Sequence, residues 1–281
     1  GGPRSQMLRT PLELNSTTLP SCQCERVHPR SFAMAAHPVI VASGPRVHAA
    51  RREWREDRFV ARFALFHHVV KDELVLPAGG ELEVLNSSAF VHRLQSEPRN
   101  LLWFTNDQEN PDFMAALAPT YEAAVPAALA AVDGFRVFSA GTVGSSHSRH
   151  AHRESWLLQL SGRKVWWFQP PGSKKLPRSA RGNGCSYFAR PPAGSTVCVQ
   201  SPGELVYFPK DWFHATCMLD RWTAGVGAQG GQPTVPGAVV GKVRRALLGR
   251  QPSRQLPARA GSRSQQHRGS KPCGRQSTCT L

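Results

Sequence analysis

Two histidines stand two residues apart, His150 and His152, just before an apolar segment that begins at Trp156. In an extended strand, residues two apart project to the same face, so both imidazoles can approach one ion. Neutral imidazole binds metals of the iron and zinc class at about 2.0–2.1 Å. A third ligand can come from a distant part of the chain, and His214 is the candidate. The residue types and their spacing therefore predict a metal site formed by His150, His152 and His214.

Two further motifs accompany these histidines. The first is Gly162-Arg163-Lys164-Val165-Trp166, and the second runs from Pro202-Gly203-Glu204 through Phe208-Pro209 to Trp212-Phe213-His214. Together they resemble the JmjC-domain/cupin-like family, which reads H-x-D/E, then G-x-K-x-W, then P-G-D/E-x-x-x-x-P-x-x-W-x-H. The likeness covers residues 22–230. It is weaker upstream, where it consists of Cys24-Glu25-Arg26-Val27, Pro38-Val39-Ile40 and Leu102-Trp103-Phe104 before Asn106-Asp107.

The resemblance implies a mainly β fold over residues 22–230, a double-stranded β-helix or jelly-roll barrel with flanking N-terminal helices. It also implies Fe(II) and 2-oxoglutarate as cofactors, and an oxygenase that hydroxylates a protein substrate. By motif, His150 and His214 take the family's histidine positions. Lys164 takes the position of the lysine that pairs with the far carboxylate of 2-oxoglutarate, and a buried carboxylate needs such a charged partner.

His152 departs from the family pattern, because an imidazole stands where the family usually has a carboxylate. Three neutral histidines still bind a divalent metal, but the site loses one negative charge. We therefore expect metal binding and leave 2-oxoglutarate turnover open, with a dioxygenase favoured. The alternative is a non-catalytic cupin-like protein that acts as a binding partner or scaffold.

A second register of the first motif is possible, in which His152 and Glu154 form H-x-E and restore a carboxylate. It places Lys164 twelve residues after the first ligand, against fourteen from His150. The family spacing is at least as long as the latter, which favours His150 and His152. His147 has an odd spacing from His150, so we expect its side chain on the opposite face of the strand.

The positive charge of the chain is concentrated at its C-terminal end. The formal net charge is +16, and residues 232–281 hold ten Lys and Arg with no Asp or Glu. This composition predicts a basic, disordered tail over residues 231–281 that does not pack on the barrel. Such a tail could contact polyanions, which is a second alternative function. Residues 1–21 are also expected to be poorly ordered.

The seven cysteines are scattered and include no CxxC pair, so they signal neither a zinc ribbon nor a thioredoxin-type site. No apolar run approaches the about 20 residues that a transmembrane helix needs, and no signal peptide is visible. A secretory or ER-lumen location is implied only by the likeness to family members that also carry H-x-H. The substrate and the oligomeric state are left open.

Short apolar segments separated by Gly and Pro turns favour a barrel or sandwich. An amphipathic helix is expected within residues 47–66, helices within 112–131, a long loop over 171–195, and a short helix at 244–248 within the otherwise disordered tail. Strands are expected at residues 37–42, 73–76, 82–85, 101–104, 135–139, 155–160, 164–168, 196–200, 204–208 and 223–226.

Overall fold

The computed structural model describes residues 21–42, 45–69, 83–96, 102–130, 132, 134–174, 184–188, 191–231 and 245–247. Residues 1–20, the strand expected at 73–76 and most of the basic segment after residue 231 lie outside these ranges. The expectations about them, including contact with polyanions, therefore stay predictions.

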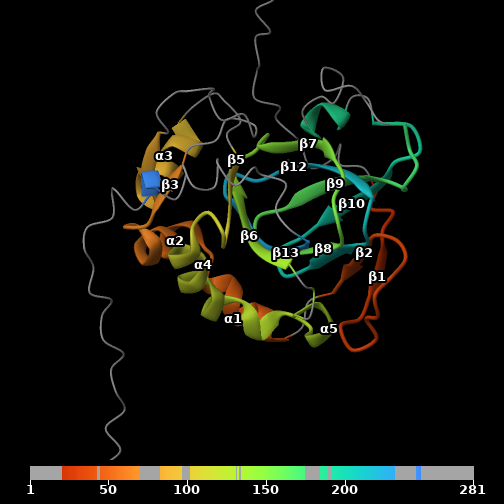
Figure 1. Cartoon of the computed structure of the whole chain (residues 1–281), viewed down its shortest axis with the longest axis horizontal. Coiled ribbons are helices and arrows are strands. Elements are labelled where there is room, and N and C mark those ends of the chain that lie inside the picture. Colours follow the sequence, from red (N-terminus) through yellow and green to blue (C-terminus); the bar gives the residue numbers. More distant parts are fainter. Residues whose placement is uncertain are drawn as a thin grey trace, which may run out of the picture. The chain divides into compact units, whose positions relative to one another are not determined.

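The described part of the chain is mainly β, and most of its strands belong to two large sheets (Figure 1). The first sheet has seven strands in the order β1-β2-β11-β8-β13-β6-β5, and the second has four in the order β10-β9-β12-β7. Strands β3 (His67–Val69) and β4 (Val84–Asn86) form a separate antiparallel pair. The bounds of the remaining strands are β1 Glu25–Val27, β2 Val39–Val41, β5 Leu102–Asn106, β6 Gly134–Gly141, β7 Ser146–His150, β8 Ser155–Ser161, β9 Lys164–Gln169, β10 Thr196–Gln200, β11 Leu205–Phe208, β12 Phe213–Met218 and β13 Thr223–Gly230.

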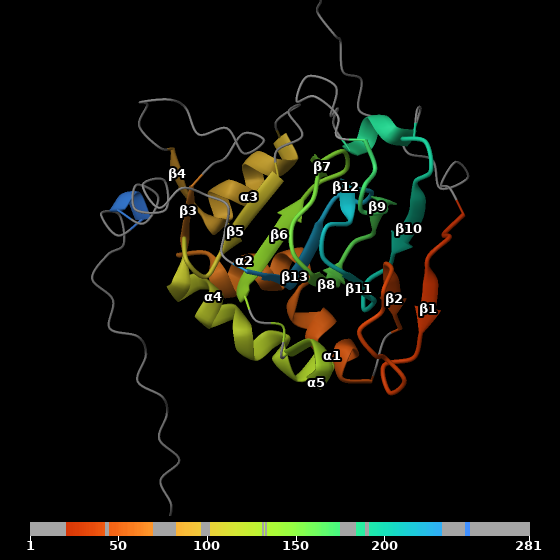
Figure 2. The ribbon, with the colours of Figure 1, turned by 45° about the vertical axis from the view of Figure 1, so that its right-hand side comes forward.

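Helices pack against one face of the seven-stranded sheet (Figure 2). They are α1 (Pro45–Glu53), α2 (Glu56–Phe63), α3 (Ser87–Ser96), α4 (Pro111–Leu117) and α5 (Ala127–Ala130), with short 3-10 turns η2 (Ala118–Thr120) and η3 (Glu122–Ala124) after α4. The spacing of Phe59 and Phe63 buries both rings of α2 in the large apolar core, where Phe59 stacks on Phe138 of β6 at 5.6 Å. This core holds one face of the seven-stranded sheet against the helices, and the opposite face of the sheet points towards the four-stranded sheet.

The apolar residues of strand β9 pack into two different hydrophobic clusters, one on each face of its sheet. Trp166 and Phe168 pack between the two sheets, whereas Val165 and Trp167 pack on the other side, against the 3-10 turn η5 (Gly184–Phe188). Successive side chains of a strand point to opposite faces, so a strand buried on both sides has no polar alternation. This explains the nearly continuous apolar sequence of β9.

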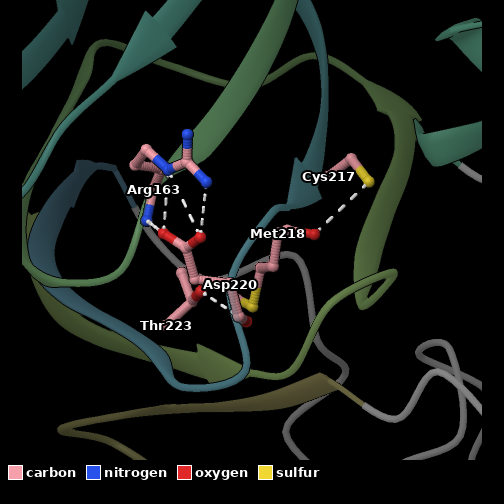
Figure 3. Close-up of polar contacts among 5 residues, drawn as sticks. All are labelled: Arg163, Cys217, Met218, Asp220 and Thr223. Atoms are coloured by element: carbon pink, nitrogen blue, oxygen red, sulfur yellow. Dashed lines mark hydrogen bonds and ion pairs between the residues drawn. The ribbon is translucent and has the colours of Figure 1, made fainter. Parts of the chain in front are cut away.

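An ion pair joins the turn before β9 to the turn after β12 (Figure 3). Arg163 donates from its backbone N–H to Asp220 Oδ2 and from Nη2 to Asp220 Oδ1, both at 2.7 Å. Burial raises the pKa of the Asp220 carboxyl, but the hydrogen bonds from Arg163 outweigh it and the pKa is lowered. Gly162 precedes this pair with φ of +64°, a conformation that favours glycine.

Two disulfides tie segments that are far apart in sequence. Cys24 bonds Cys198 of β10, with a Cα–Cα distance of 5.2 Å, and Cys185 of η5 bonds Cys217 of β12, with 4.8 Å. Cys24 precedes β1 at the edge of one sheet, and β10 is the edge of the other. The Cys24–Cys198 bond therefore links the two sheets, a role that the scattered cysteine spacing did not reveal.

Several elements differ from the sequence expectations. Strands β7 and β12 and helix α3 were not predicted as such, and residues 47–66 form two helices and not one. The short helix expected at residues 244–248 is present as a helical turn at Arg245–Leu247, and Leu247 is buried against Val69 and Val84. Leu247 thus packs on the separate β3–β4 pair, and the expectation that the basic tail does not pack on the barrel stays a prediction.

No helix within the described ranges is both long and apolar enough to cross a membrane.

Candidate metal centre

His150 and His214 lie opposite each other on paired strands. His150 is the last residue of β7, and the antiparallel register with β12 places it across from His214. Their ring centroids are 4.2 Å apart. The pairing of two strands thus brings together histidines that are 64 positions apart in the sequence.

His152 reaches the same place by another route. It lies after β7 has ended, in the connection to β8, so strand alternation does not orient it as expected. The backbone N–H of Asp211, in the turn before β12, donates to the His152 carbonyl at 2.8 Å. Asp211 holds a positive φ of 66°, which Asp tolerates better than most residues. The His152 ring lies 5.3 Å from that of His150 and 4.6 Å from that of His214.

The three imidazoles are oriented for binding one ion. One ligand atom from each residue lies within 4.8 Å of the other two. In each ring Nδ1 bonds a backbone carbonyl: Ser148 O at 2.7 Å, Arg153 O at 2.7 Å and Trp212 O at 3.1 Å for His150, His152 and His214, respectively. A carbonyl only accepts, so these bonds assign the proton to Nδ1 and the metal-binding lone pair to Nε2.

Burial keeps two of these rings neutral. It lowers the pKa of His152 to about 3 and that of His214 well below its ordinary value of 6.5, with the neighbouring histidines adding to both shifts. A metal ligand must be deprotonated, so an uncharged imidazole is ready to bind. The burial of His214 comes from aromatic neighbours, above all Phe208 with its ring centroid 4.4 Å away.

Lys164, the first residue of β9, extends into the same cavity. Its side chain is almost fully buried, and Nζ donates to Ser139 Oγ at 3.2 Å. Burial lowers the pKa of the Lys164 ammonium to about 7. A buried ammonium bonded to a neutral hydroxyl is poorly compensated, and an anion placed beside it would stabilise it. The sequence-predicted residues His150, His152, His214 and Lys164 therefore all line one cavity.

The cavity has a volume of about 250 Å³ and is lined by both sheets. One side is apolar and includes Phe135, Val137 and Leu157. Among its polar lining residues are Asn106, Ser139, Ser155, Thr216 and Gln229, and the described lining residues include no carboxylate. Asn106 also stabilises a local turn, because its Oδ1 accepts from the backbone of Gln108 and Glu109.

His147 also lines this cavity, contrary to the expected opposite face. The pairing of β7 with β12 is irregular: His150 pairs with His214 but His147 pairs with Thr216, so three steps on β7 match two on β12. Such a β-bulge re-aims the side chains beyond it. The His147 ring lies 5.6 Å from that of His150 and edge-on to Phe104 at 5.1 Å. Nothing in the sequence signals this bulge.

Glu154, the carboxylate of the alternative register, is not among the residues that line the cavity. Its carboxylate lies against Gly230 of β13, and its carbonyl accepts from the Gly230 N–H at 2.8 Å. Within the described part of the chain, the group of possible ligands at this site holds three histidines and no carboxylate.

No protein-family model matches the chain. It is 32% identical over 108 residues to the human 2-oxoglutarate and iron-dependent oxygenase JMJD4, covering 32% of this chain and 25% of the relative. The chain is related to the JmjC-domain proteins. Human JmjC domain-containing protein 8 is 32% identical over 90 residues, covering 30% of this chain and 33% of the relative.

A shorter JmjC match is to the bifunctional lysine-specific demethylase and histidyl-hydroxylase NO66 of Drosophila persimilis. It is 36% identical over 63 residues, or 22% of this chain and 8% of the relative. The chain thus spans about a quarter of JMJD4, a third of protein 8 and less than a tenth of NO66.

A second buried histidine, His68, forms a Ser–His–Asn cluster outside this cavity. Asn110 Nδ2 lies 3.0 Å from the His67 carbonyl and 3.3 Å from His68 Nδ1. Asn110 must therefore donate to Nδ1, and His68 Nε2 carries the proton that it donates to Ser87 Oγ at 2.7 Å. In this tautomer His68 cannot accept the serine proton, so the cluster stabilises the fold and is not a nucleophile with its base.

The buried histidines predict that the metal-free protein loses stability in mild acid. Burial lowers the folded-state pKa of His68 well below 6.5, whereas the unfolded chain protonates this residue near 6.5. The free energy of unfolding is therefore highest above pH 6.5, where this histidine is neutral in both states. Below pH 6.5 the unfolding free energy falls by up to about 1.4 kcal/mol per pH unit for each such buried histidine. We expect urea unfolding in EDTA between pH 7.5 and 5 to show this slope. In His68→Gln the unfolded chain takes up about one proton fewer, so the slope of unfolding free energy against pH should fall by up to about 1.4 kcal/mol per pH unit. An unchanged slope would contradict the prediction.

Proposed function

We propose that the chain is a JmjC-type protein that binds Fe(II) through His150, His152 and His214 and 2-oxoglutarate beside Lys164. Its oxygenase turnover is limited by His152, and its substrate is a protein side chain. The observation that carries this proposal is the convergence of three imidazoles, each bonded through Nδ1 to a backbone carbonyl, in the cavity that also holds Lys164.

The strand order supports a double-stranded β-helix as the framework of this site. Strands β6, β8, β11 and β13 lie in the seven-stranded sheet, in the order β11-β8-β13-β6, and β7, β9, β10 and β12 form the four-stranded sheet. Eight strands that pass back and forth between two sheets in this way are typical of the jelly roll, to which cupins belong. The site then lies between the two sheets.

The residues fit the proposed cofactors. When bound, Fe(II) supplies the redox chemistry, with 2-oxoglutarate as the reductant for dioxygen. The chain's own contribution is to hold three neutral nitrogens in place and to present the Lys164 ammonium to a carboxylate, with Ser139 positioning Nζ. Phe135 and Val137 give the cavity an apolar side, which favours the exclusion of water when the cofactors are bound.

A secretory or ER-lumen location is part of this proposal. Disulfides persist in oxidising compartments and are rare where glutathione keeps thiols reduced. The Cys24–Cys198 and Cys185–Cys217 pairs support such a compartment for this chain. Intact mass after alkylation of the non-reduced protein should show four cysteines protected, and four alkylated cysteines at these positions would refute this part.

Anaerobic Fe(II) titration followed by a 2-oxoglutarate decarboxylation assay tests the function. We expect the native protein to bind Fe(II) and to turn over 2-oxoglutarate weakly or not at all, because three imidazoles leave the metal its full positive charge. His152→Asp restores a carboxylate ligand and should raise turnover by about tenfold or more, since a ligand acts directly on the metal.

Two outcomes would contradict parts of this proposal. Efficient turnover by the native protein that His152→Asp abolishes would show that the three-histidine site is itself the working oxidant site. If neither form binds metal while both remain folded, the chain is a non-catalytic cupin-like binding protein.

A further inference from the structure

The cavity around the three histidines has an unbalanced charge. Its described lining residues include Lys164 and four histidines but no Asp or Glu. The partners that orient the ligand rings do not supply negative charge either, because each Nδ1 bonds a neutral backbone carbonyl. Neither the three rings nor their carbonyl partners would therefore neutralise any of the charge of a bound divalent metal.

The acidic residues closest in sequence to the three histidines do not line the cavity. Glu154 lies against Gly230, and Asp211, whose backbone supports His152, has an exposed carboxylate near Lys210. Farther along the chain, Asp220 is paired with Arg163, and Glu204 with Arg26. These four carboxylates are therefore not available to balance a cation inside the cavity.

The face of an aromatic ring attracts cations. The aromatic residues Phe104, Phe135, Trp166 and Phe208 line the cavity. Lys164 Nζ already lies 5.6 Å from the Trp166 ring, within the range of a cation–π contact. The metal and Lys164 together carry three positive charges, and bound 2-oxoglutarate supplies two negative ones. A second ammonium would therefore still meet a net positive charge, whose repulsion exceeds the attraction of a ring face.

We infer that this cavity selects a substrate group that is uncharged or anionic, and that it rejects ammonium and guanidinium groups because His152 replaces a carboxylate. This inference rests on the proposed function and names its substrate class. The preference would separate the chain from the relative whose name describes a lysine-specific demethylase.

The test uses Co²⁺, whose absorption spectrum reports the site without turnover. The full-length protein is loaded with Co²⁺ and 2-oxoglutarate and titrated with three small probes of similar size: propionate, propionamide and propylammonium. We expect propionate and propionamide to perturb the spectrum at concentrations at least about tenfold lower than propylammonium. In the matched variant His152→Asp, the preference for propionate over propylammonium should fall by about tenfold, because one negative charge returns to the metal.

The outcomes separate this inference from the proposed function. A Co²⁺ spectrum that responds equally to all three probes, or an unchanged preference in His152→Asp, would overturn the inference alone. If the native protein takes up no Co²⁺ at all, the proposed function fails, and the inference fails with it.

Discussion

Replacing His214 with alanine should weaken metal binding at least about 100-fold, more than the 10–100-fold typical of a residue that only supports a ligand. His214 is the buried member of the three, and its ring lies within 4.6 Å of both other ligand rings, centroid to centroid. Two imidazoles without it leave an incomplete site. Isothermal titration with Fe(II) under anaerobic conditions, or with Zn²⁺, measures the change.

His147→Ala is the matched control for this experiment. His147 lines the same cavity on the same strand as His150, but it is not part of the group whose ligand atoms converge. Its substitution should change metal affinity by less than about tenfold, the lower limit for supporting residues. Urea unfolding of both variants checks that each is folded. Equal losses in His147→Ala and His214→Ala would show that the metal uses a different set of nitrogens.

Removing the Cys24–Cys198 disulfide should cost about 2–5 kcal/mol of unfolding free energy. The bond closes a loop of 174 positions, so it restricts the unfolded chain strongly. It also lies in the apolar cluster between the sheets, with Trp166, Phe168 and Phe208. The double variant Cys24→Ser and Cys198→Ser, which leaves no unpaired thiol from this pair, should unfold at a clearly lower urea concentration than the native protein under non-reducing conditions.

Cys22→Ser is the control for this second prediction. Cys22 is the one unpaired cysteine in the described part of the chain, and it packs at the side of the same cluster. Its substitution should shift the unfolding free energy by about 0.5 kcal/mol or less. A double variant as stable as the native protein would mean that the Cys24–Cys198 bond does not form in solution.

Local sequence patterns predicted many of the elements that frame the site. Apolar segments bounded by Gly and Pro indicated strands at β6, β8, β9, β10, β11 and β13 to within a few residues, because burial and turn chemistry are local properties. The two strands that carry His150 and His214, β7 and β12, were missed as elements. SHSRH has no apolar residue, and in FHATCM the apolar run is interrupted by His214 and Thr216, which both line the cavity.

The sequence by itself determined which residues could meet at a metal, because the motifs are defined by residue type and spacing along the chain. His150, His152, Lys164 and His214, all predicted from these motifs, line one cavity. Tertiary structure decided how they meet. The bulge between β7 and β12 turns His147 into the cavity, and the Asp211 turn holds His152 outside any strand. Packing against β13 directs Glu154 away, and pairing across 174 positions joins Cys24 to Cys198. Each of these depends on contacts between segments distant in the chain, which no local spacing encodes.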